Sequence, residues 1–379
     1  MKYFYSTCQC LLLTLCLSAQ SQQATTPQLL AESAPPAPET LAAEEPAEEA
    51  AGEETEEATW EFSGSADVYY QVNTNGQAPG LTAFTPDHNS VSLGMAKVAA
   101  ARSFGKVGMQ VDLGFGPRAD VANGFLGTSF AQIQQLFITY QPTEKVTLTA
   151  GNFGTHFCYE VVDPAANFHY STSYMFTYGP FYHTGIKADV ALSDRLSVMV
   201  GLFDDTDNKF DVLAGKHFGA QVGYATDAGD IYLNYLTGTD GVDTVSAHQV
   251  DLVAAFELNE KWSLGVNTTV KQINPDGDQL ESSRLFGAAL YLDYAVSETL
   301  ALGLRTESFN DFNGVIFGVP DLSIFATTLS ANVQIGELTF IPELRVDAAS
   351  ADIFTDITGD LPEATGVSPR FLMAAVYAF

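Results

Sequence analysis

The last eleven residues, 369–379, form an alternating apolar segment that strongly restricts the fold. One face of a strand here would carry Phe371, Met373, Ala375, Tyr377 and Phe379, because successive side chains point to opposite sides. The face between them is small and apolar, and the sequence stops on an aromatic residue. An exposed strand of this kind would be a sticky edge in water. It therefore belongs either to the core of a soluble protein or to a barrel that closes against its first strand.

The same alternation recurs from Trp60 onward. In segment 107–113, Val107, Val111 and Leu113 oppose Gln110 and Asp112. Such a period of two, with one apolar and one polar face, is expected of transmembrane β-strands. It is also compatible with a soluble sandwich that has one face packed on a core.

The connections between these segments separate the two possibilities. Short turns are expected at Ser103, Thr143-Glu144, Ser193-Asp194, Asp227–Gly229, Asn259-Glu260, Ser297-Glu298 and Gly336-Glu337. Between them lie longer links at 73–89, 115–128, 155–180, 204–215, 239–245, 273–281, 310–321 and 350–368. Strict alternation of turns and loops is typical of a meander with turns on one rim and loops on the other.

Seven turns and eight loops predict about sixteen strands, so the predicted fold is all-β, a transmembrane antiparallel up-and-down β-barrel with both termini on the turn side. At ~3.3 Å per residue and a tilt of ~40°, ten residues span roughly 25 Å, the height of the outer-membrane apolar band. A barrel of this size has a wet interior. Segments 81–84 and 174–178 are either extra strands or parts of loops.

The N-terminal region differs from the barrel region, 60–379. Residues 1–19 are predicted to be a secretory signal peptide, with Lys2 followed by the apolar stretch 11–17 and by small residues. Residues 20–59 are rich in Ala, Glu and Pro and contain no Lys or Arg. We expect them to be a disordered acidic spacer, because they cannot bury enough apolar surface to fold.

Composition excludes two classes of function. The chain is 46% hydrophobic, yet no apolar run of 18 residues occurs after the N-terminus, which excludes a helical membrane protein. The formal charge of −30 argues against nucleic acid as a partner. The six histidines have no metal-ligand spacing, and no nucleophile elbow or phosphate loop is present. We therefore expect no metal, no cofactor and no enzymatic activity.

The segment from Gly151 to Gly185 is the most distinctive part of the chain. Its motifs Tyr159-Glu160 and Tyr178-Gly179-Pro180-Phe181-Tyr182-His183-Thr184-Gly185 resemble the second family of β-barrel porins of Gram-negative outer membranes. His156 and Cys158 stand where the family pattern has Pro and Gly. The C-terminal strand is similar to the last strand of outer-membrane barrels, in which a terminal Phe is an insertion signal. These resemblances imply a pore-forming barrel that engages the barrel-assembly machinery through Phe379.

The aromatic link 155–180 is too apolar for an idle surface loop. As the third long loop it is expected to fold into the lumen and narrow the pore, with packing over the rim or at a subunit interface as the alternatives. Glu160 and Asp163 would then face the channel, with His183 and Lys187 nearby as the other constriction residues. Acidic groups at a constriction favour cations.

Charged residues also occur at inward positions of several strands. These lumen-wall candidates are Asp251, Glu257, Lys271, Asp293, Arg305, Glu307, Glu343, Arg345 and Asp347. They form either mutually neutralising pairs or a field across the pore. Arg345, with Glu343 and Asp347 on the same face, favours pairs.

The sequence thus predicts an outer-membrane porin for passive diffusion of small hydrophilic solutes, with a preference for cations and with periplasmic termini. The alternatives are a non-conducting structural or binding barrel that anchors the envelope through its acidic tail, and, less favoured, an outer-membrane enzyme. Expected partners are outer-membrane lipid, lipopolysaccharide and the assembly machinery, with a homotrimer as a possible assembly.

Overall fold

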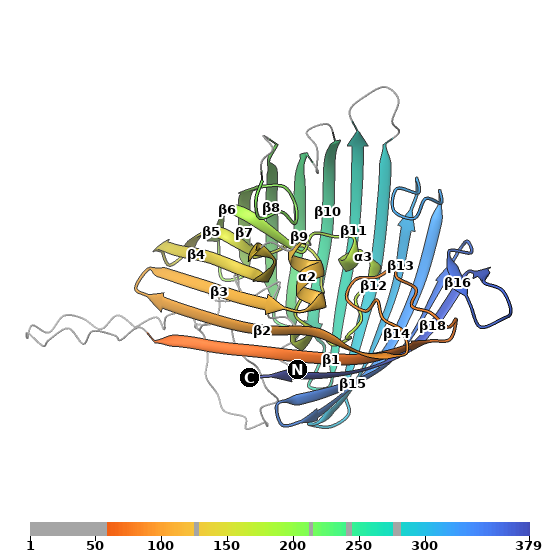
Figure 1. Ribbon diagram of the computed structural model, residues 1–379. Coiled ribbons are helices and arrows are strands. Elements are labelled where there is room, and N and C mark those ends of the chain that lie inside the picture. The colour runs from red at the N-terminus through yellow and green to blue at the C-terminus, as the bar shows by residue number, and fades with distance from the viewer. Residues whose placement is uncertain (1–58, 125–128, 212–214, 240–244, 276–281) are drawn as a thin grey trace, which may run out of the picture.

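The computed structural model describes residues 59–124, 129–211, 215–239, 245–275 and 282–379. Sixteen strands close into one antiparallel barrel (Figure 1), in which each strand pairs with its neighbours along the chain and β1 pairs with β18. The predicted all-β up-and-down barrel is confirmed. The predicted signal peptide and all but the last residue of the predicted spacer lie outside the described residues.

The barrel strands alternate inward and outward side chains, with register shifts where β1 pairs with β2, β3 with β4 and β4 with β5. They are β1 (Trp60–Asn73), β2 (Ser90–Phe104), β3 (Val107–Phe115), β4 (Ile133–Thr143), β5 (Val146–Gly154), β6 (Tyr182–Ala191), β7 (Leu196–Phe203), β8 (His217–Thr226), β9 (Gly229–Thr239), β10 (Val245–Glu257), β11 (Trp262–Pro275), β12 (Ser283–Ala295), β13 (Leu300–Asp311), β14 (Leu322–Ile335), β15 (Leu338–Ala349) and β18 (Val367–Ala378). Short turns and long loops alternate between them, as predicted.

Three sequence-based assignments are settled by the strand boundaries. The first turn lies at Gly105 and Lys106, so the prediction of a turn at Ser103 was wrong by two residues. Gly105 has a φ of +55°, which glycine adopts without strain, and this explains the later turn. Segment 81–84 contains no strand, and segment 174–178 contains the short helix α3 (Tyr174–Thr177) instead of a strand.

The closing seam joins the two ends of the barrel. Register pairs run from Ser65 with Ala378 to Asn73 with Arg370. Next to the Ser65–Ala378 pair, the backbone groups of Gly64 and Phe379 exchange two hydrogen bonds of 3.0 Å. The exposed terminal strand that the sequence presented is therefore paired along its full length.

The outer surface is apolar and the interior is polar. In β11, Trp262 and Val270 are exposed on the outside, whereas Ser263 and Asn267 are buried inside. The wall is uneven in height, because β3, β5 and β7 have 8 to 9 residues and β10 to β12 have 13 to 14. Figure 1 shows the taller strands rising above β3 to β7.

The remaining elements lie in the long loops. They are α2 (Pro117–Asn123), η2 (Ser129–Gln132), η3 (Pro164–Ala166), α3, and the hairpin of β16 (Phe354–Asp356) and β17 (Glu363–Thr365). No helix in the described part of the chain is long and apolar enough to cross a membrane.

Candidate functional site

The third long loop, residues 155–181 (L3), lies inside the barrel. It connects β5 to β6, and its side chains Phe157, Tyr170 and Tyr174 are 0% exposed. The Tyr159 ring stacks on Tyr291 of the β12 wall with centroids 4.2 Å apart. L3 thereby buries the aromatic surface that would be costly to leave in water.

Carboxylates of the wall bind the backbone of L3. Glu307 accepts hydrogen bonds from the backbone N–H groups of Tyr174 and Met175, at 2.8 and 2.7 Å. Glu343 accepts from the N–H of Tyr170 at 3.1 Å. Because an irregular loop leaves backbone donors unpaired, and buried donors need partners, these carboxylates replace the hydrogen bonds of regular structure. Bonds to a charged acceptor are also stronger than neutral ones.

Asp251 makes the corresponding contact near the start of L3. Its Oδ2 accepts from the backbone N–H of Cys158 at 3.2 Å and from the side-chain amide of Asn234 at 3.0 Å. Its Oδ1 accepts from the amide of Asn267 at 2.6 Å. Wall residues therefore bind the L3 backbone at Cys158, shortly after β5, and again at residues 170–175.

Guanidinium groups bind the carbonyl oxygens of the same loop. Arg305 donates to Ser171 O at 2.6 Å, and Arg345 donates to Thr172 O at 2.6 Å. Arg118 of α2 donates to Val162 O at 3.2 Å and to Tyr170 O at 3.1 Å. Carboxylates thus accept hydrogen bonds from the N–H groups of the L3 backbone, and guanidinium groups donate to its carbonyl oxygens.

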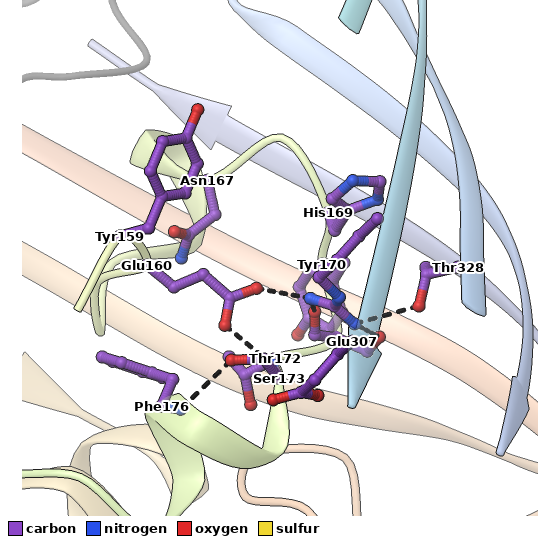
Figure 2. Close-up of polar contacts among 12 residues, drawn as sticks. Tyr159, Glu160, Asn167, His169, Tyr170, Thr172, Ser173, Phe176, Glu307 and Thr328 are labelled. Carbon is purple, nitrogen blue, oxygen red and sulfur yellow. Dashed lines mark hydrogen bonds and ion pairs between the residues drawn. The ribbon is translucent and has the colours of Figure 1, made fainter. Parts of the chain in front are cut away.

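Glu160 and Asp163, two of the predicted constriction residues, hold L3 in place. The Glu160 carboxylate pairs with Arg305 and accepts from the backbone N–H of Ser173 at 2.7 Å (Figure 2). Asp163 pairs with Lys97 of β2 and caps η3 by accepting from the N–H of Ala165 at 3.2 Å. Burial alone would raise the pKa of Asp163, but the Lys97 charge and the hydrogen bonds outweigh it and hold the pKa below its ordinary value.

The other two predicted constriction residues have separate partners. His183 Nε2 lies 3.0 Å from Thr155 Oγ1, and its ring stacks on Phe203 at 4.6 Å. Lys187 forms an ion pair of 3.1 Å with Asp189. The structure does not join these two side chains to Glu160 or Asp163 in one cluster.

The predicted lumen-wall residues fall into several environments. Arg345 pairs with Asp347 at 2.7 Å, and Arg370 pairs with the same carboxylate at 3.3 Å. Glu257 is exposed at the end of β10, on the turn-side rim. Lys271 lines a cavity beside L3. The fully or nearly fully buried members are Asp251, Asp293, Arg305, Glu307, Glu343, Arg345 and Asp347.

Sequence reasoning missed three basic residues that take part in this network. Lys97 lies between the apolar residues Ala96 and Val98, and Arg118 lies in a loop. Arg370 shares the inward face of β18 with residues that we had described as small and apolar. The alternation of side chains along β2 and β18 could have placed Lys97 and Arg370 on the inward face; no such pattern was available for Arg118.

The apolar inner face of β18 is explained by L3. Leu372, Ala374 and Val376 are at most 3% exposed and cluster with Tyr170 of the loop. The helical turn η3 contacts the same strand. This face is apolar inside a polar barrel because L3 packs against it.

Two cavities lie beside the loop. One, of about 240 Å³, is bounded by residues 177–181 of L3, by Gln249 of β10 and by Lys271 of β11. The other, of about 50 Å³, lies between L3 and the strands β2 to β5, where Lys97, Asp112 and Asp163 line it. Phe181 borders both. L3 therefore occupies part of the lumen and leaves polar space on both of its sides.

A closed sixteen-strand barrel with an apolar exterior, a polar interior and a loop bound inside it defines a porin-like outer-membrane channel. The chain belongs to the family described as "Putative beta-barrel porin-2, OmpL-like", whose model matches residues 59–379. The resemblance predicted from the L3 motifs is confirmed. Proteins of this family are channels rather than enzymes, and they are outer-membrane proteins of Gram-negative bacteria.

Solved structures with similar folds include other outer-membrane proteins. The anion-selective porin from Comamonas acidovorans has a TM-score of 0.59 at 9% identity, over 85% of this chain and 100% of that one. The outer-membrane channel DcaP of Acinetobacter baumannii has a TM-score of 0.59 at 11% identity, over 85% and 97%. The trimer form of OmpT from Vibrio cholerae has a TM-score of 0.56 at 11% identity, over 85% and 99%.

At these identities the likeness concerns the fold alone. No curated protein sequence matches the chain at a significant level.

Proposed function

We propose that this protein is an outer-membrane channel for passive diffusion of small hydrophilic solutes, with L3 narrowing the pore and with both termini in the periplasm. The observation that carries the proposal is that charged wall residues bind the L3 backbone inside the barrel. Cavities of about 240 and 50 Å³ lie beside the loop that they hold. In this proposal the fixed internal loop restricts solutes by size, and the space beside it provides the path.

The interior charge supports a preference for cations. Among the described residues, twelve buried carboxylates accompany four buried arginines. Glu160 and Asp163 are paired with Arg305 and Lys97, so in this proposal they fix the shape of the constriction. Asp112 would then contribute more directly to the preference, since its carboxylate accepts from the amides of Gln110 and Gln135 and lines the smaller cavity. His183 and Lys187, both on β6, would contribute to the channel wall.

Purified, refolded barrel in planar bilayers tests the proposal. Stepwise single-channel currents are expected, together with liposome permeability that falls steeply across a series of sugars of increasing size. A barrel that is folded, as judged by its heat-dependent mobility in gels, but carries no current and passes no solute would overturn the assignment.

A non-conducting structural barrel is the second candidate, because L3 fills so much of the lumen with packed aromatic rings. Phe153, Phe157, Phe176 and Phe203 form one buried cluster inside the barrel. In that case, deletion of residues 20–59 would disturb envelope attachment and leave solute permeability unchanged.

The proposed partners follow from the surface and the seam. Outer-membrane lipid and lipopolysaccharide would cover the apolar outer wall. Phe379 is paired with Gly64 in the closed barrel, so the assembly machinery would bind it before closure. A homotrimer is proposed from the fold it shares with the trimer form of OmpT; the mass of the purified complex in mild detergent would test it.

A further inference from the structure

A row of polar side chains crosses the outer surface of strands β9 to β12. Thr237, His248, Gln272 and Arg284 lie in direct register on β9, β10, β11 and β12, strands that stand side by side in Figure 1. Their neighbours along the chain point inward, because Lys271 lines the lumen cavity and Leu285 is 5% exposed. Strand alternation therefore turns the row toward the lipid.

The depth of the row places it at a membrane interface. Trp262 and Tyr294, with ring centroids 4.5 Å apart, mark the turn-side aromatic girdle of these strands. Gln272 lies ten residues beyond Trp262 on the same face of β11. Ten residues in a tilted strand rise by roughly 25 Å, the height of the apolar band of an outer-membrane barrel. The row therefore lies at the loop-side edge of that band, at the level of lipid headgroups.

Arg284 and His248, two residues of this row, carry groups that can bind an anion. The Arg284 guanidinium lies over the Phe312 ring, 5.1 Å from its centroid, which fixes its position. Nδ1 of His248 contacts Thr237 Oγ1 at 2.8 Å and Tyr235 OH at 3.1 Å. In the tautomer in which these hydroxyls donate to Nδ1, the proton is on Nε2, and Nε2 is then a hydrogen-bond donor.

The surroundings favour negative charge. In the described part of the chain, the outward faces of β9 to β13 carry no Asp or Glu, although the protein has 46 acidic residues. Arg284 and His248 are two strands apart, which is about 10 Å, with the Gln272 amide between them.

We propose that this row binds the phosphorylated disaccharide headgroup of lipopolysaccharide, with one phosphate at Arg284 and the other toward His248. The width of two strand spacings suits a disaccharide that carries a phosphate at each end better than the single phosphate of a two-chain phospholipid. The proposal rests on the proposed function only for orientation, since the loop side must face the outer leaflet.

Native mass spectrometry of the refolded full-length barrel tests the site. The probes are bisphosphorylated lipid A, monophosphorylated lipid A and phosphatidylglycerol, each at matched concentration. Arg284→Gln is expected to weaken lipid A binding about tenfold, the effect of losing one charge-assisted hydrogen bond. Arg102→Gln is the matched control: Arg102 is also outward and lies over a ring, Trp60, at 5.5 Å, but on the turn side.

The outcomes separate the possibilities. Loss of lipid A binding in Arg284→Gln but not in Arg102→Gln, with tighter binding of the bisphosphorylated than of the monophosphorylated form, supports the site. Equal loss in both variants, or equal binding of phosphatidylglycerol, overturns it. Because this assay needs no current, a barrel that binds lipid A but fails to conduct would refute the proposed channel and leave the lipid site standing.

Discussion

At the scale of single residues, the buried charges bind backbone as much as they bind each other. Arg305 contacts the Glu160 carboxylate, Ser171 O and Thr328 Oγ1 at once. Replacing it by glutamine would leave the Glu160 carboxylate buried without its cation, a change that costs about 3–5 kcal/mol in buried pairs. We expect Arg305→Gln to loosen L3, to increase open-channel current noise and to expose L3 to protease.

The control for this change is the same substitution on the surface. Arg195 pairs with Asp227 at 2.6 Å on a turn, where both side chains are more than half exposed. An exposed pair contributes about 0–1 kcal/mol, so Arg195→Gln should leave noise and proteolysis unchanged. An Arg305→Gln channel as quiet and as protease-resistant as the wild type would contradict the role assigned to L3 anchoring.

Lys209 in the loop between β7 and β8 gives a pH-dependent prediction. Its Nζ lies 3.8 Å from the centre of the Tyr182 ring and donates to Asn123 O at 2.9 Å. Burial lowers the pKa of Lys209 to about 8, against the opposing effect of Asp207. In the folded state it should therefore lose its proton near pH 8, and its labelling by an amine-reactive reagent should rise with a midpoint there.

Lys216, in the same loop, is the internal control. Hydrogen bonds to Asp211 and Asp204 raise the pKa of Lys216, so it should stay protonated and label slowly at pH 8 to 9. Between pH 8 and the ordinary lysine value, the folded state binds fewer protons at Lys209 than the unfolded state, so its contribution to stability grows as pH rises. Mass spectrometry of labelled peptides measures both residues; identical pH profiles would refute the assignment.

At the scale of elements, L3 needs glycines in the wall to make room for it. A Cβ at Gly303 would lie 2.3 Å from the Phe168 ring, and a Cβ at Gly287 would lie 2.1 Å from Cγ of Met175. A buried ring cannot bend away, whereas methionine has three rotatable bonds. We expect Gly303→Ala to lower stability by about 1–3 kcal/mol, as overpacking does, and to increase cleavage within L3.

Gly287→Ala should cost less, because Met175 can change rotamer. Chemical denaturation of the folded barrel in detergent, with the cleavage pattern of L3, compares the two variants. Equal effects would mean that ring packing at Phe168 does not position the loop.

The strands could be predicted from the sequence, whereas the position of L3 could not. Strand faces follow a period of two, and the membrane demands an apolar exterior, so β1 or β11 can be assigned from local residues alone. The destination of L3 could not be assigned, because Tyr170 and Glu343 are 173 residues apart in sequence and meet only after closure. Alternation places Arg305 inward, but it does not distinguish a bare pore wall from a group that binds a loop.

At the scale of the whole molecule, the excess of buried carboxylates over arginines predicts ion preference and its dependence on salt. Charges inside the lumen act over a Debye length, which is about 30 Å at 0.01 M salt and 3 Å at 1 M. Cation-over-anion permeability, from the reversal potential in a salt gradient, should therefore exceed one at low salt and decline toward one as salt rises.

The same measurement identifies the residues that set this preference. Asp112→Asn should reduce the low-salt ratio, because Asp112 lines the smaller cavity without being one of the contacts that anchor L3. Glu298→Gln, on an exposed turn at the rim, removes the same charge from the molecule and should leave the ratio nearly unchanged. If the two substitutions lowered it equally, net charge at the mouth would set the preference; a wild-type preference for anions would reject the role given to the buried carboxylates.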